Sequence, residues 1–64
     1  SQDPKEASIQ YEELAQQSTR SKDKVGYFIE ASSLSTQVRD LERAEGLLQQ
    51  AMKEADENKE LKTT

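Results

Sequence analysis

The stretch VGYFIEASSLSTQV, residues 25–38, carries two sets of apolar or small side chains at helical spacing. The first set is Val25, Phe28, Ile29 and Ser32, and the second is Tyr27, Ala31, Leu34 and Val38. The members of the second set lie three or four residues apart, and those of the first lie three, one and three residues apart. Each set therefore forms a stripe along an α-helix. Because the two stripes cover more than half of the helix surface, we expect this helix to pack between two neighbours. The sequence therefore predicts a central helix over residues 22–38.

The segment before it predicts a first helix over residues 4–19. Asp3 is suited to cap a helix, Pro4 fits the first helical position, and Glu6 follows Asp3 at the spacing of a capping box. The expected stripe is Ala7, Tyr11, Leu14, Ala15 and Ser18. A polar break covers residues 18–24, in which Ser21 is the expected cap of the central helix. The small residues at 32–36 should let another helix approach the central one closely.

The segment after it predicts a third helix over residues 41–60, capped by Asp40 and followed by a tail at 61–64. Its expected stripe is Leu41, Ala44, Leu47, Leu48, Ala51 and Ala55, with Leu61 further on. No run reads as a strand. The sequence thus predicts one all-α domain over residues 1–64, a small antiparallel three-helix bundle with up-down-up topology.

The chain has little material for a core. Of its 64 residues 31% are apolar, which is twenty, and six of these are Ala, so only fourteen are large. We therefore expect its stability to depend on a neighbour, which is a partner chain, a second copy or the rest of a longer protein such as a helical-repeat array. The start at Ser1 without an initiator Met fits a processed product or a trimmed domain.

Composition excludes several classes of function. Without His or Cys the chain has no imidazole base, no thiolate and no ordinary zinc or haem ligand set. The paired carboxylates Glu12–Glu13 and Glu42–Glu45 are interpreted as solvated helix surface. A net charge of −4 disfavours nucleic acid and anionic membranes as partners. We expect no enzyme, cofactor, metal site or membrane insertion, and a cytoplasmic location, because Cys, signal and transmembrane segments are absent.

Four apolar residues lie outside the main interfaces that three short helices would bury. These candidate partner-binding residues are Ile9, Tyr27, Leu34 and Met52. Met is the adaptable kind of side chain that partner surfaces use. We expect at least two of the four to belong to a surface that binds another protein, although single exposed apolar residues are also ordinary.

The second and third predicted helices resemble a tetratricopeptide-repeat hairpin. The matching features are Phe28 with Ala31 and Ser32, the pattern Ala44-x-x-x-Leu48-x-x-Ala51, and Asp40 in the turn; Ala7-x-x-x-Tyr11-x-x-Leu14 looks like the end of a preceding repeat. The resemblance covers about one and a half repeats. It lacks the large aromatic near Leu34 and the closing proline, in whose place stands Asp56-Glu57-Asn58. Leu41-x-Arg43-Ala44-Glu45-x-Leu47 also resembles the last helix of microtubule-interacting-and-trafficking domains.

Both resemblances imply binding of a helix or peptide from another protein. The sequence therefore favours a non-enzymatic interaction module, adaptor or assembly subunit, with an acidic rim that suits basic partners. The alternative is a self-associating structural bundle without an external ligand. A regulatory inhibitor of an enzyme cannot be separated from the first class at this point.

Overall fold

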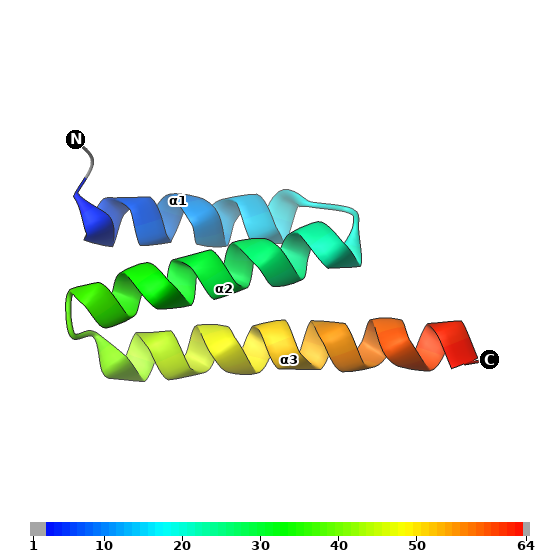
Figure 1. Cartoon of the computed structure of the whole chain (residues 1–64). Coiled ribbons are helices and arrows are strands. Elements are labelled where there is room, and N and C mark those ends of the chain that lie inside the picture. Colours follow the sequence, from blue (N-terminus) through cyan, green and yellow to red (C-terminus); the bar gives the residue numbers. More distant parts are fainter. Residues whose placement is uncertain (1–2, 64) are drawn as a thin grey trace.

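The computed structural model describes residues 3–63, with side chains as far as Lys59. This part of the chain consists of three α-helices without a strand: α1 (Pro4–Gln17), α2 (Ser21–Gln37) and α3 (Leu41–Thr63). The helices run up, down and up beside one another (Figure 1). The predicted all-α three-helix bundle is thus confirmed.

Two helix ends differ from the prediction. α1 ends at Gln17, before Thr19, because Ser18 closes it: its backbone N–H and its hydroxyl both donate to the Leu14 carbonyl, at 3.0 and 2.8 Å. α3 continues to Thr63, so the expected tail is wrong for residues 61–63. Thr64 and the side chain of Leu61 lie outside the described residues.

Aspartate caps begin α1 and α3 as predicted. The Asp3 carboxylate accepts a hydrogen bond from the Lys5 N–H at 3.1 Å, and Pro4 is the first helical residue. The Asp40 carboxylate accepts from the Arg43 N–H at 3.4 Å. Each cap satisfies a backbone donor that has no partner within its helix.

The start of α2 departs from the prediction. Arg20 occupies the cap position without a side-chain bond to the helix, and Ser21 is already the first helical residue. The Ser21 hydroxyl instead donates to Glu54 Oε1 on α3 at 3.1 Å. Ser21 therefore joins the beginning of α2 to the later part of α3, which local sequence rules do not reveal.

The turn between α2 and α3 is closed by backbone bonds. Arg39 has a φ of 64°, in the left-handed region. Its N–H donates to the Thr36 carbonyl at 3.0 Å, and the Asp40 N–H donates to the Ser35 carbonyl at 2.9 Å. This pair of bonds is a Schellman motif, which ends α2. Because Asp40 also caps α3, one residue serves the ends of both helices.

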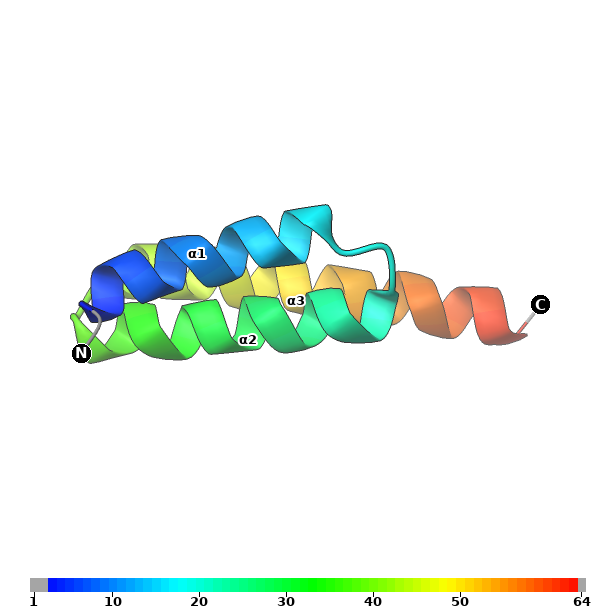
Figure 2. The same cartoon turned by 90° about the horizontal axis from the view of Figure 1, so that it is seen from above.

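α2 is the central element, as predicted. It packs closely against both α1 and α3, whereas α1 and α3 approach each other much less closely (Figures 1 and 2). The molecule is correspondingly flat, with extents of 43 × 20 × 12 Å. Each outer helix therefore has one close neighbour and can bury only a narrow stripe.

Small residues dominate the core. The buried apolar residues are Ala7, Ala15, Phe28, Ala31, Ala44, Leu47 and Ala51. Only Phe28 and Leu47 among them are large. Five large residues of the expected stripes are exposed instead. They are Leu14 by 42%, Ile29 by 46%, Val38 by 39%, Leu41 by 59% and Leu48 by 45%. The buried stripe of each helix is therefore narrower than its sequence pattern suggested.

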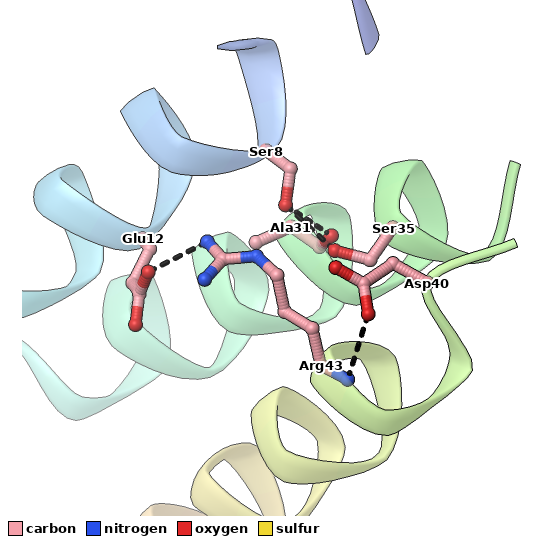
Figure 3. A network of polar contacts seen from close by, with 6 residues as sticks. All are labelled: Ser8, Glu12, Ala31, Ser35, Asp40 and Arg43. Carbon is pink, nitrogen blue, oxygen red and sulfur yellow. Dashed lines mark hydrogen bonds and ion pairs between the residues drawn. The ribbon is translucent and has the colours of Figure 1, made fainter. Parts of the chain in front are cut away.

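Buried serines hold the helices together across the small-residue contacts. The Ser8 hydroxyl on α1 lies 2.8 Å from both the Ala31 carbonyl and the Ser35 hydroxyl on α2 (Figure 3). The Ser32 hydroxyl donates to the Ala44 carbonyl of α3 at 2.8 Å. Bonds of this length between elements require close backbones, as expected from the small residues at 32–36. Within the described side chains, no buried polar atom lacks a partner.

Candidate docking site

An apolar groove runs between α2 and α3. Its lining residues are Val25, Ile29, Leu48, Ala51, Met52 and Ala55, which we call the α2–α3 groove. The residues of each helix recur at intervals of three or four, so they form one row on α2 and a double row on α3. Ala51 is buried and forms the floor. Met52, Ile29 and Leu48 form the walls and are 66%, 46% and 45% exposed.

The groove lies on the side of α2 that faces away from α1. Tyr27 packs towards α1, where its ring centroid lies 6.0 Å from that of Tyr11. Ile29 follows two residues later, about 200° further around the helix. On α3, Arg43 reaches back to Glu12 of α1, and the groove residues lie on the opposite flank. α1 therefore leaves the groove uncovered.

The groove gathers much of the exposed apolar surface. The large apolar residues that are exposed are Ile9, Leu14, Ile29, Val38, Leu41, Leu48 and Met52. Three of these seven line the groove, and Leu41 lies two turns before Leu48 on the same side of α3. Ile9, Leu14 and Val38 are not among its lining residues. Single exposed apolar residues are ordinary on a protein surface, whereas these residues lie together.

The structure does not bring the four candidate partner-binding residues together. Met52 lines the groove, whereas Ile9 lies on the outer side of α1 and is 40% exposed. Tyr27 is half-buried against the core, and Leu34 is half-buried on the α1 side of α2. Of these candidates, Met52 alone is a lining residue of the α2–α3 groove.

The neighbours of Met52 were missed because sequence periodicity assigned them to the core. Val25, Ile29 and Leu48 belong to the expected stripes of α2 and α3. These stripes would be fully buried only if one more helix packed against both α2 and α3. The groove could have been predicted from two pairs of apolar residues spaced four apart, Leu48–Met52 on one helix and Val25–Ile29 on the other. Such pairs form two matching apolar rows.

Comparisons with known proteins give no family. The chain matches no family model, no curated protein and no solved structure. The similarity to tetratricopeptide hairpins therefore rests on the quoted residues alone and stays a prediction.

Charges flanking the groove are balanced. The exposed charged residues three, four or seven positions from its wall residues are Lys22, Glu45, Asp56 and Lys59. Two are acidic and two are basic, which differs from the acidic rim expected from the net charge. Glu45 lies towards the α2–α3 turn, whereas Lys22, Asp56 and Lys59 lie towards the other end. The groove thus has a different charge at each end.

Other kinds of site find little support in the described residues. No group of three or more acidic side chains there is arranged to hold a metal ion. None of the described helices has both the length and the apolar character that crossing a membrane requires. What the groove offers chemically is an apolar strip with charged edges, which suits the apolar face of another helix.

Proposed function

We propose that this chain is a non-catalytic protein-association module whose α2–α3 groove receives the apolar face of a helix. The observation that carries the proposal is the gathering of the exposed residues Ile29, Leu48 and Met52 beside the buried Ala51. Covering these side chains removes apolar surface from water, which is the main driving force of association.

The shape of the groove favours a helix over an extended peptide. Its walls repeat at one-turn intervals along two antiparallel helices, which matches anchors at i, i+3, i+4 and i+7 of an incoming helix. Within the described residues α2 and α3 have no unpaired strand edge to which an extended segment could add. A third helix packed here would repeat the contact that α2 already makes with its neighbours.

The test is a titration with a model helix. A neutral peptide of about 18 Leu, Ala and Gln residues, with Leu on one face, is about 27 Å long as a helix. Added to the ¹⁵N-labelled chain, it should shift the amide signals of Val25, Ile29, Leu48 and Met52 in a saturable way. A peptide of the same composition with Leu distributed around the helix is the control, and it should bind much more weakly.

Two variants sharpen the result. Met52→Glu places a carboxylate in the groove wall and should weaken binding at least tenfold, because burying an unpaired charge is unfavourable. Ile9→Glu makes the same change on the outer side of α1 and should leave binding unchanged. The proposal fails if the peptide does not saturate, or if the shifts cluster around Ile9, Tyr27 or Leu34 instead.

A further inference from the structure

We propose that the occupant of the α2–α3 groove is a second copy of this chain, related to the first by a two-fold axis that crosses the groove. This inference rests on the proposed function and names its partner. The two copies would bring their α2–α3 pairs face to face and leave both α1 helices on the outside.

The charge pattern supports a second copy over a basic partner. The four residues that flank the walls carry no net charge, so they offer a strongly basic helix no general attraction. Glu45 is at one end of the groove, and Lys22, Asp56 and Lys59, two basic residues and one acidic, are at the other. A two-fold axis between the ends brings Glu45 of one copy towards the lysine-bearing end of the other. Such self-complementarity is what an isologous interface requires.

The small number of large apolar side chains in the core also supports a second copy as the occupant of the groove. Of the large apolar side chains, Phe28 and Leu47 are buried, whereas Ile29, Leu41, Leu48 and Met52 are exposed on the groove side. A dimer through the groove would supply each copy with an apolar layer of large residues that the isolated chain lacks. The interface would also be closed, because both copies use the same groove, so association would stop at two copies.

The first experiment is sedimentation equilibrium of the full chain from micromolar to millimolar concentration, read beside helical circular dichroism. We expect a monomer–dimer equilibrium without larger species. Met52→Glu should weaken it at least tenfold, since the two-fold interface contains that carboxylate twice. Ile9→Glu should leave the dissociation constant within about twofold, because Ile9 lies outside the groove and exposed substitutions away from such features have small effects.

Charge exchange tests the two-fold arrangement without changing the apolar groove. Two variants place like charges together, and each should weaken the dimer by about fivefold to tenfold. One is Glu45→Lys, and the other combines Lys22→Glu with Lys59→Glu. The three substitutions combined restore opposite charges and should recover the original affinity within about threefold. Failure of the combined variant to recover would overturn the two-fold arrangement.

The remaining outcomes separate this inference from the proposed function. A helical chain that stays monomeric at millimolar concentration overturns the proposal that a second copy fills the groove. If the neutral Leu peptide still binds to that monomer, the proposed function stands. A dimer that survives Met52→Glu but is lost with Ile9→Glu overturns the groove as the interface. An open-ended series of larger species overturns the closed two-fold geometry. A monomer that also ignores the peptide overturns both proposals.

Discussion

At the scale of single residues, Arg39 has the least favourable backbone for its type. Its φ of 64° lies where the Cβ atom crowds the following carbonyl oxygen, at a cost of about 1–2 kcal/mol for an L-residue. The conformation directs the N–H groups of residues 39 and 40 back to the last turn of α2. The short turn therefore contains local strain that a glycine would not have.

We expect Arg39→Gly to raise the free energy of unfolding by about 0.5–1 kcal/mol, because relief of the strain exceeds the added flexibility of the unfolded chain. Urea denaturation followed by circular dichroism measures the change. Gln37→Gly, at an exposed residue in the last turn of α2, is the matched control and should lower stability by about 0.5–1 kcal/mol. Equal effects of the two glycines would contradict the role of φ at Arg39.

Local chemistry explains which of these residue-level features could be predicted. The Asp3 and Asp40 caps follow from short-range rules, because each carboxylate bonds an N–H two or three residues later. The contact of Ser8 with Ser35 joins residues 27 positions apart. Neither Ser8 nor Ser35 belongs to an expected stripe, so nothing in the local pattern marks either hydroxyl as buried.

At the scale of the helices, one ion pair links the two outer elements. Arg43 on α3 reaches past α2 to Glu12 on α1, with 2.6 Å between Nη2 and Oε1 (Figure 3). Both side chains are partly exposed, by 31% and 24%, so solvent screens the attraction. The pair nevertheless joins two helices that have few other contacts with each other.

A double-mutant cycle with Glu12→Gln and Arg43→Gln should give a coupling energy of about 0.5–1 kcal/mol, measured by urea denaturation. The coupling should fall as salt is raised from 50 mM towards 1 M, since the Debye length shortens to about 3 Å. A second cycle with Glu13→Gln, at the exposed neighbour of Glu12, should show no coupling to Arg43. Equal coupling in both cycles would mean that general charge, and not this contact, is responsible.

The helices themselves were predictable, but the width of their buried faces was not. Two apolar stripes over residues 25–38 indicated a central helix because they cover most of its surface. On α3 the same reasoning assigned Leu48 to the core together with Leu47. The number of neighbours decides how wide a buried stripe is, and α3 has one close neighbour. Leu47 faces it and is 2% exposed, whereas Leu48 lies 100° away and lines the groove.

At the scale of the whole molecule, the chain is a thin assembly of helices whose core is mostly Ala and Ser. Among the side chains that the structure describes, two large apolar ones are buried and seven are exposed. Burial of a Leu or Phe contributes about 2 kcal/mol, and Ala contributes much less. A chain of this kind gains most from any event that covers its exposed leucines, isoleucines and methionine.

Thermal stability should therefore depend on concentration. If a second copy binds the folded chain, the midpoint of unfolding should rise by several degrees between about 5 and 500 μM, because dimerisation stabilises the folded state by mass action. Circular dichroism melts over this range measure the shift. Met52→Glu should melt at one temperature throughout, and Ile9→Glu should keep the concentration dependence. A constant midpoint for the unsubstituted chain would contradict the prediction.

The two connections between helices differ in a way that bears on how the protein opens. The α2–α3 turn shares Asp40 between two helix ends, whereas Arg20, at the cap position before α2, makes no side-chain bond to the helix. α1 is also held mostly by small residues and serines. Cooperative units of unequal stability follow from such differences. In hydrogen exchange, the amides of α1 should exchange when α1 detaches while the α2–α3 hairpin stays folded. The amides of that hairpin should exchange last.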